Sequence, residues 1–264
     1  TTTTGVSSAS PSTSLSLSIT ATGTAVPAAV VVRSSSATGA SSTGVTCTNT
    51  GLIRVLAGKL TINSMSGPLG DISISPGASL TLGGQYSINK PLSVSAGGKL
   101  TLGGAWSNSS TVSSSGGSLS LSGNWSNSGT FDVSNSAWSI GGTYPTLGAH
   151  TGSGNQLTYA GTYPGTSLVA DSSTGDITLA TLTMNGATLL AGGGSRFITA
   201  ANSVVTLNSC SLDGELAIQS CGGLTISGGL NLINGAVVRV RNNPCSRVAM
   251  TFTGASQTIG GTGR

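Results

Sequence analysis

The sequence predicts an all-β protein that folds as a parallel β-solenoid. Three observations support this: an apolar–polar–apolar triplet returns every 19 to 20 residues, apolar and small polar residues alternate between the triplets, and glycine pairs separate the alternating segments. A fixed period of this length is typical of a solenoid, in which each unit buries its apolar face against the next unit. The alternation indicates strands with one buried face, and glycine permits the positive φ angles of tight corners.

The repeat is most regular over residues 60–144, where the triplet begins at positions 60, 80, 100, 119 and 138. Further apolar residues follow twelve and fourteen positions after a triplet start, so each coil is expected to hold about three short strands. An aromatic residue follows six positions after four of the starts. This aromatic column consists of Tyr86, Trp106, Trp125 and Tyr144. Aromatic columns are usually core, but an outward-pointing column would offer stacking faces to sugars.

The repeat divides the chain into two parts. Residues 1–45 are rich in threonine and serine, and we expect a strand or stalk segment there, since Leu15, Leu17 and Ile19 alternate with polar residues. We expect the solenoid to span residues 46–264 in roughly eleven coils, with an irregular stretch at 145–176 where the period is lost. No capping pattern is visible near residues 261–264, so we expect a further domain or another subunit to continue the stack.

The composition differs from that of an ordinary globular domain and argues against nucleic-acid binding and a membrane span. Only 6% of the 264 residues are charged, against about 25% in ordinary globular domains, and the net charge is +4. The basic residues are scattered except for Arg239, Arg241 and Arg247, which lack interleaved aromatic residues, so we expect no nucleic-acid binding. No apolar run is long enough for a membrane span and no signal peptide is visible at the start.

Four cysteines are present: Cys47, Cys210, Cys221 and Cys245. An even number in a hydroxyl-rich chain suggests disulfides and an oxidising compartment, with three connectivities open. Cys221 and Cys245 are 24 residues apart, the separation closest to one coil, whereas free buried thiols are the alternative. Without a Cys-x-x-Cys pair we expect no metal site.

Two asparagine patterns stand out in the regular repeat. Trp106-Ser107-Asn108 and Trp125-Ser126-Asn127 are near copies, so Asn108 and Asn127 are expected to stack as a hydrogen-bonded ladder along the axis. Asn108-Ser109-Ser110 and Asn124-Trp125-Ser126 are also N-glycosylation sequons. Asn124 is expected at a corner, where a glycan could attach, whereas an Asn108 laddered inside the solenoid could not carry one.

The acidic residues give little sign of catalysis. Solenoid enzymes that cleave polysaccharides need carboxylates for acid–base work or for holding a metal. We expect Asp213 and Glu215 to lie in a solvated turn, and Asp171 and Asp176 to be turn residues. We expect His150 to lie in a solvated loop. The chain contains six acidic residues: Asp71, Asp132, Asp171, Asp176, Asp213 and Glu215. We therefore expect no catalytic residue, no metal and no cofactor.

The repeat resembles those of filamentous-haemagglutinin-like and autotransporter-type adhesins, which are extracellular β-helix proteins. The segment 118–131, Ser-Leu-Ser-Leu-Ser-Gly-Asn-Trp-Ser-Asn-Ser-Gly-Thr-Phe, carries this resemblance, because an Asn-x-Gly-x-apolar turn follows a Leu-x-Leu strand. It covers residues 60–144 well and 177–264 loosely. The resemblance implies a right-handed parallel β-helix, secreted to a cell surface, that acts as a stiff stalk or adhesive fibre.

These observations favour a structural function. We expect a subunit or segment of an extracellular filament, stalk or adhesin that assembles with copies of itself through strand pairing and stacking of solenoid ends. Glycans are further candidate partners or modifications. The alternative is a β-helix protein that binds or cleaves polysaccharides.

Overall fold

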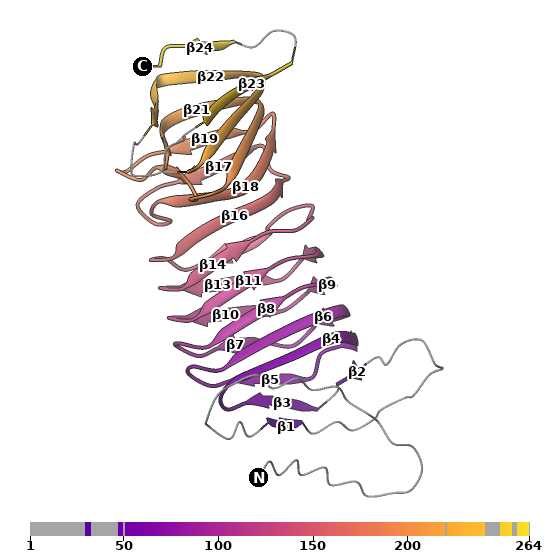
Figure 1. Ribbon diagram of the computed structural model, residues 1–264. Coiled ribbons are helices and arrows are strands. Elements are labelled where there is room, and N and C mark those ends of the chain that lie inside the picture. Colours follow the sequence, from indigo (N-terminus) through magenta and orange to yellow (C-terminus); the bar gives the residue numbers. More distant parts are fainter. Residues whose placement is uncertain are drawn as a thin grey trace, which may run out of the picture.

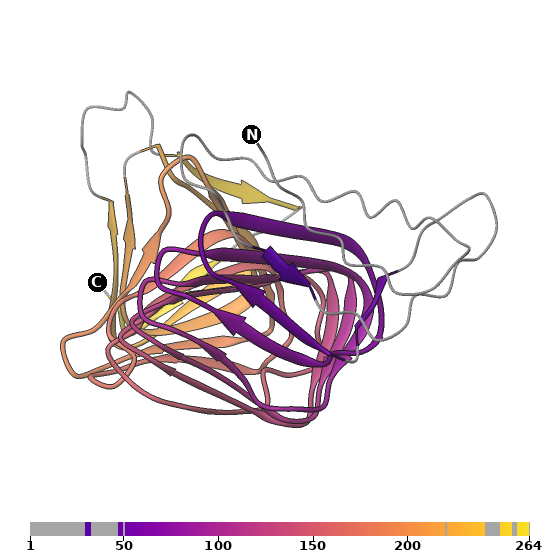
Figure 2. The ribbon, with the colours of Figure 1, turned by 90° about the horizontal axis from the view of Figure 1, so that it is seen from below.

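The protein is a rod of stacked coils in a computed structural model that describes residues 30–32, 47–49, 51–219, 221–240, 249–254 and 258–263 (Figure 1). The fold is a parallel β-solenoid of about 10 turns, and its winding is consistent with the expected right-handed β-helix. No helix among the described residues is long and apolar enough to cross a membrane. Seen along the axis, successive coils lie over one another (Figure 2).

A regular turn has three strand segments, which build three faces of the rod; in the turn that begins at Ala137 only the bridge residue Thr143 stands on the second face. The turn that begins at Ser79 is representative: β6 (Ser79–Ile88) supplies the first face and, after a corner at Gly84, the second face, and β7 (Leu92–Val94) supplies the third. In the last turns all three segments merge into long strands that bend at each corner. We call these the first, second and third face throughout.

The strands fall into three groups. The first face begins β4 (Lys59–Pro68), β6, β16 (Gln156–Tyr163) and β18 (Ile177–Asn185), and also holds β8 (Lys99–Leu102), β11 (Ser118–Leu121), β14 (Ala137–Ile140) and β20 (Phe197–Thr199). The second face holds β2 (Cys47–Thr48), β9 (Ala105–Asn108), β12 (Asn124–Asn127), β23 (Ala249–Thr253) and the later parts of β4, β6, β16 and β18. The third face holds β3 (Leu52–Val55), β5 (Asp71–Ile74), β7, β10 (Thr111–Ser115), β13 (Thr130–Ser134), β15 (Ala149–Thr151), β17 (Ser167–Ala170), β19 (Thr188–Ala191) and β24 (Ile259–Gly261). The long strands β21 (Val204–Ile218) and β22 (Gly223–Val240) contribute to all three faces.

The strand register reproduces the sequence period residue for residue. Leu60, Leu80 and Leu100 are direct partners in neighbouring parallel strands, and the column continues through Leu119 and Trp138. These side chains are fully buried and form part of one core that runs the length of the rod. The core therefore consists of stacked apolar residues, which in the regular part are of the same type, and this is why a 19- to 20-residue spacing appears in the sequence.

The stretch 145–176 keeps the period on the first face. Leu157 pairs with Trp138 on one side and with Ile177 on the other, and Phe197 follows Ile177 in the same column. The third face is different, because β15 and β17 are not paired with each other, although all residues between them are described. The second face is interrupted as well, because β12 is joined to the next turn only by the bridge between Asn124 and Thr143. The irregularity expected here thus affects the second and third faces and spares the first.

The two ends of the rod differ. At the first turn, β1 (Val30–Val32) pairs antiparallel with β3 and occupies the outer edge of the third face. At the last described turn, Val240, Phe252 and Ile259 are exposed by 54%, 48% and 43% of their surface. In the preceding turn the strand partner of Phe252 is Ile226, which is 0% exposed, and the partner of Ile259 is Leu230, which is 1% exposed. The alternating residues Leu15, Leu17 and Ile19 lie outside the described residues.

Candidate functional site

The second face carries no charged residue in any described turn. Its outward side chains form two columns, two residues apart along each strand. In the N-terminal half the first column contains Gln85, Ala105 and Asn124, and the second column contains Ser87, Ser107 and Ser126. In the C-terminal half the first column consists of partnered threonines: Thr162, Thr183, Thr206, Thr225 and Thr251. The face is therefore a long uncharged surface of hydroxyl and amide groups.

An open groove of about 480 Å³ crosses this face over β6, β9 and β12. It is hollow because Ala105 lies directly between Gln85 and Asn124 in the register, so a methyl group is flanked by two longer amides. Gly67 and Pro145 also line the groove. The backbone of β6 and β9 is fixed on both sides by the parallel ladder, and β12 is fixed by β9 on one side and by the bridge from Asn124 to Thr143 on the other. The groove is therefore preformed.

The outward-facing amides and hydroxyls of the groove have no hydrogen-bond partner among the described residues. The amides of Gln85 and Asn124 and the hydroxyls of Ser87, Ser107 and Ser126 all line it, and each is at least partly exposed. Both amides offer donors and acceptors, as the hydroxyls do. The groove thus presents a set of unused neutral hydrogen-bonding groups to a ligand.

The aromatic column lies directly beneath this face and points inward. Tyr86, Trp106, Trp125 and Tyr144 are at most 5% exposed, and consecutive rings stack with centroid distances of 6.4, 5.1 and 4.3 Å. Each indole nitrogen in the stack donates to a carbonyl of the following coil, Trp106 to Ser122 and Trp125 to Gly141. The rings are core, so their faces are not available to stack on sugars.

Burial also fixes the protonation state of the tyrosines near this column. Desolvation raises the pKa of Tyr86, Tyr144 and Tyr159 well above the ordinary value for a phenol, and nearby Tyr163 adds to the shift at Tyr144 and Tyr159. These hydroxyls therefore stay neutral throughout the ordinary pH range.

Asn108 and Asn127 lie at the corner between the second and third faces. Asn108 Nδ2 donates to Asn127 Oδ1 at 2.8 Å, and Asn127 Nδ2 donates to the carbonyl of Leu147 at 2.8 Å. Asn108 Oδ1 accepts from the backbone N–H of Ser110, and Asn127 Oδ1 accepts from Gly129. Each amide thus joins two coils and also closes its own turn, as Asn49 does with Gly51.

Replacing Asn127 with alanine is expected to lower the free energy of unfolding by about 2–3 kcal/mol, because buried groups on two coils lose partners. Asn127 is only 8% exposed, so water cannot readily substitute for the amide. The exposed Asn63→Ala provides the control, with an expected change below about 0.5 kcal/mol. Urea unfolding followed by circular dichroism measures both, and equal midpoints for the two variants would show that the ladder adds no stability.

The two sequons lie in different environments. Asn108 is 1% exposed and its Nδ2 donates to Ser110 and Asn127, so a glycan on this atom would have to occupy the interior. Asn124 is exposed at the start of β12 and points into the groove. Of the two, only Asn124 offers a nitrogen accessible to a glycan, and its glycosylation stays a prediction.

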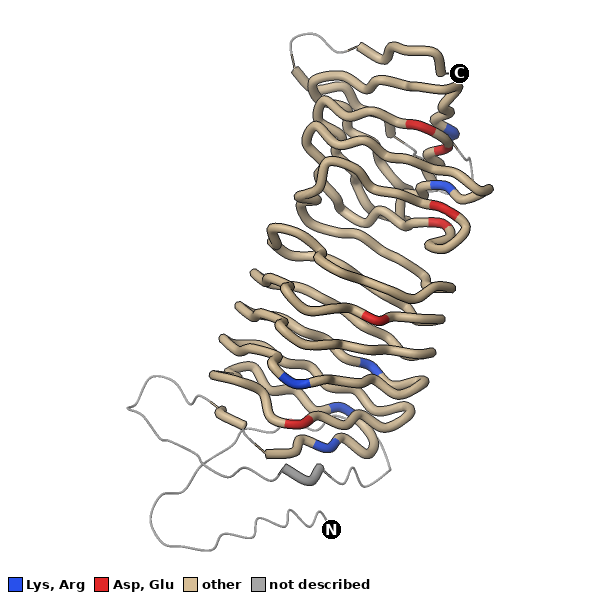
Figure 3. The backbone as a smooth tube through the Cα atoms, turned by 180° about the vertical axis from the view of Figure 1, so that it is seen from behind, with Lys and Arg blue, Asp and Glu red and all other residues tan. Residues whose placement is uncertain are grey.

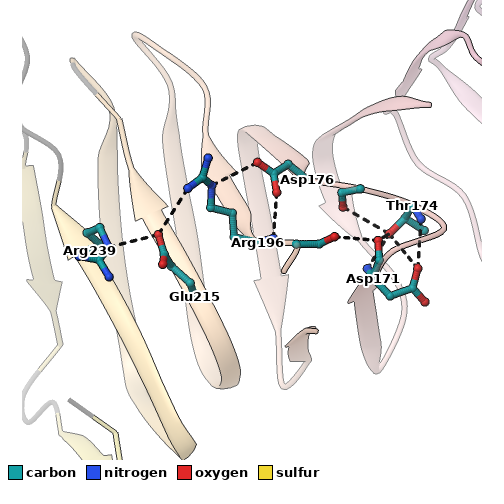
Figure 4. A network of polar contacts seen from close by, with 8 residues as sticks. Asp171, Thr174, Asp176, Arg196, Glu215 and Arg239 are labelled. Atoms are coloured by element: carbon teal, nitrogen blue, oxygen red, sulfur yellow. Dashed lines mark hydrogen bonds and ion pairs between the residues drawn. The ribbon is translucent and has the colours of Figure 1, made fainter. Parts of the chain in front are cut away.

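A ladder of charged residues connects four successive turns near the C-terminal end (Figure 4). Arg196 Nε lies 3.1 Å from Asp176 Oδ2 and its Nη1 lies 3.9 Å from Glu215 Oε1, which is also 3.2 Å from Arg239 Nε. Each of these partly exposed pairs is worth at most about 1 kcal/mol. The alternation of signs nevertheless favours one stacking register over its neighbours.

The remaining acidic groups also have local partners. Asp71 pairs with Lys90 at 3.5 Å, Asp213 accepts from Asn234, and Asp132 accepts from Thr151 (compare the positions of the charges in Figure 3). Asp171 caps an exposed turn, and the hydroxyl of Ser173, followed by backbone N–H groups of Thr174 and Ser173, lowers the pKa of its carboxyl. Asp213 and Glu215 face different partners because Gly214, at a φ of 105°, turns the chain between them.

No group of three or more potential metal ligands occurs among the described residues. His150 is exposed, its ring lies edge-on to Trp138 at 6.1 Å, and Nδ1 contacts the carbonyl oxygen of Gly148. Each acidic side chain is thus engaged in a turn, a hydrogen bond or an ion pair, and the described residues show no cleft with converging carboxylates.

The structure contradicts the predicted disulfides at two of the four cysteines. Cys47 and Cys210 are free, so a disulfide at either of them is wrong. Cys47 lies in β2 near the first turn and Cys210 lies in β21 near the last, which places their sulfurs far beyond bonding distance. Burial raises the pKa of both thiols, which keeps them protonated. Cys221 is disulfide-bonded, and Cys245 lies outside the described residues.

Comparison with protein-family models, with curated proteins and with solved structures finds no match for this chain. The solenoid fold of the suspected adhesin-type relatives is present, but membership of that family stays a prediction. The groove and the charge ladder were not anticipated from the sequence. Asp176, Arg196 and Glu215 each come directly before an apolar residue of the first face, at spacings of 20 and 19 residues, so the period could have revealed the ladder.

Proposed function

We propose that this chain is a structural segment of an extracellular filament, stalk or adhesin. The observation that carries the proposal is the single core of stacked apolar residues that continues through about 10 turns. Every turn is joined to the next by parallel backbone hydrogen bonds, which makes such a rod stiff along its axis. At about 4.8 Å per turn the solenoid is roughly 50 Å long.

The chemistry of the surface supports a mechanical role over a catalytic one. General acid–base catalysis needs groups that converge on a substrate with matched pKa values. The acidic residues are instead spread along the rod and bound to neighbouring side chains or turns. We infer that the chain is not an enzyme, and that an oxidising extracellular compartment would preserve the disulfide at Cys221.

The ends of the rod support directional assembly. The third-face edge of the first turn is already occupied by β1, whereas the last described turn exposes Phe252 and Ile259 from columns that are buried in the preceding turns. Exposed apolar side chains next to unpaired strand edges favour addition of another strand. We infer that a further turn packs on the surface formed by β23 and β24, supplied by a copy of the chain or by further domains of a longer chain, and the experiment below tests the copy.

Electron microscopy and sedimentation test this assembly. The wild-type protein is expected to form end-to-end rods that lengthen with concentration, and Phe252→Ser combined with Ile259→Ser is expected to leave single rods. Val169→Ser is the matched control, because Val169 is also 43% exposed but lies on β17, away from the ends. Single rods of the wild type at all concentrations, or equal loss of assembly in the control, would contradict end stacking.

A further inference from the structure

The groove on the second face presents hydrogen-bonding groups that the filament role does not use. We propose that it binds a neutral glycan chain, held by Gln85, Asn124 and the serines between them. The proposal does not depend on filament assembly, because the groove lies over β6, β9 and β12 and not at either end of the rod.

The chemistry of the lining selects the ligand class. Acidic polysaccharides, phosphates and nucleic acids need cationic partners, and no charged side chain lines the groove or belongs to the described strands of the second face. Sugar hydroxyls donate and accept hydrogen bonds at the same time, and so do the serine hydroxyls and primary amides that remain unpaired here. An apolar ligand would leave these five polar groups without partners, which costs free energy.

The repeat of the solenoid fits a ligand that is itself a repeating chain. Ser87, Ser107 and Ser126 are direct partners in adjacent strands, so equivalent hydroxyls recur at about 4.8 Å along the axis. Gln85 and Asn124 stand on either side of Ala105, one strand away in each direction. A chain laid along the axis would therefore meet the two amides in succession, with the Ala105 methyl group beneath it.

The buried aromatic column limits the strength of this site. Trp106 and Trp125 lie under the groove with their rings stacked on each other and at most 4% exposed, so they cannot stack on a sugar. Affinity must come from hydrogen bonds and shape alone, which predicts weak binding per site. Assembly of many rods would strengthen it through multivalency.

Affinity electrophoresis in gels that contain soluble polysaccharides tests the proposal. The full chain is produced in a host that adds no N-glycans, so that Asn124 stays bare. Neutral probes are a soluble cellulose derivative, glucomannan and a β-1,3-glucan, and polygalacturonate is the acidic probe. We expect retardation by at least one neutral probe, unchanged between low and high salt because no charges take part, and none by polygalacturonate.

Three variants locate the binding. Gln85→Ala and Asn124→Ala are each expected to weaken it about three- to tenfold, the loss of one or two hydrogen bonds, and Ala105→Phe is expected to abolish it by filling the hollow. Gln156→Ala removes an exposed amide from the first face and is the matched control, with unchanged binding expected. Circular dichroism confirms that each variant is folded.

Several outcomes would overturn the proposal. These are the absence of retardation by every neutral probe, retardation by polygalacturonate alone, and binding that survives Ala105→Phe. Inhibition of ice recrystallisation by the wild type, without retardation by any glycan, would instead assign the uncharged face to ordered water, and the glycan proposal would then be wrong.

Discussion

Gly104→Ala is expected to lower the free energy of unfolding by about 3–5 kcal/mol, the combined cost of a strained backbone and an overpacked contact. Gly104 lies at the corner between the first and second faces with a φ of 83°, and a Cβ there would lie 2.3 Å from the carbonyl oxygen of Gly84 in the preceding coil. Gly123 and Gly142 repeat this arrangement in the next two coils. The coils can stack at the strand spacing only because this column has no side chains.

Gly77→Ala separates the cost of the strained backbone from the cost of the overpacked contact. Gly77 has nearly the same φ, 75°, but a Cβ there would meet no atom within 4 Å. Only the left-handed conformation is then penalised, so we expect a loss of about 1–2 kcal/mol. Guanidinium unfolding followed by circular dichroism compares the two variants. Equal losses would show that the corner tolerates a side chain and that the close approach of the coils does not limit the sequence.

The regular half of the rod was predictable because its core repeats one residue type at one spacing. Leu60, Leu80 and Leu100 lie in register as their positions indicated. Asn108 and Asn127 also meet as neighbours one coil apart. In a solenoid, residues that are one period apart in the sequence are neighbours in adjacent coils, so a fixed spacing predicts contacts directly.

The C-terminal half was harder to predict, since its columns change residue type while keeping the period. Trp138, Leu157, Ile177 and Phe197 occupy one column at spacings of 19, 20 and 20, yet no repeated motif joins them. The core there requires an apolar side chain of suitable volume and does not specify which one. The interruption at 145–176 was consequently placed on the whole coil, although the first face keeps its pairing and only the second and third faces are interrupted.

The groove could not be predicted, because it depends on a contrast between neighbouring coils. Ala105 is unremarkable in the sequence, and it creates a hollow only when the register places it between Gln85 and Asn124. The charge ladder was obscured for a related reason. Asp213 and Glu215 are close in sequence, but the corner at Gly214 gives them different neighbours, and Glu215 meets Arg196 and Arg239 from adjacent coils.

Trp125→Ala is expected to lower the free energy of unfolding by about 4–5 kcal/mol, at the upper end for truncation of a buried aromatic side chain. Its ring lies between Trp106 and Tyr144, with centroid distances of 5.1 and 4.3 Å, and Phe131 meets it edge-on at 6.1 Å. Truncation would leave a cavity and would also remove the donor to the Gly141 carbonyl. Because each coil packs only on its neighbours, the loss would weaken the interfaces on both sides.

Trp125→Phe distinguishes packing from hydrogen bonding. Phenylalanine keeps a ring in the stack but lacks the indole N–H, so we expect a smaller loss of about 1–2 kcal/mol, mainly from the unpaired carbonyl. Chemical unfolding gives the stabilities, and near-ultraviolet circular dichroism reports on the order of the remaining rings. If Trp125→Ala instead changed the stability by less than about 0.5 kcal/mol, as surface substitutions usually do, the ring would have to lie on the surface. The aromatic column would then not belong to the buried core, and its rings would be available for stacking on sugars.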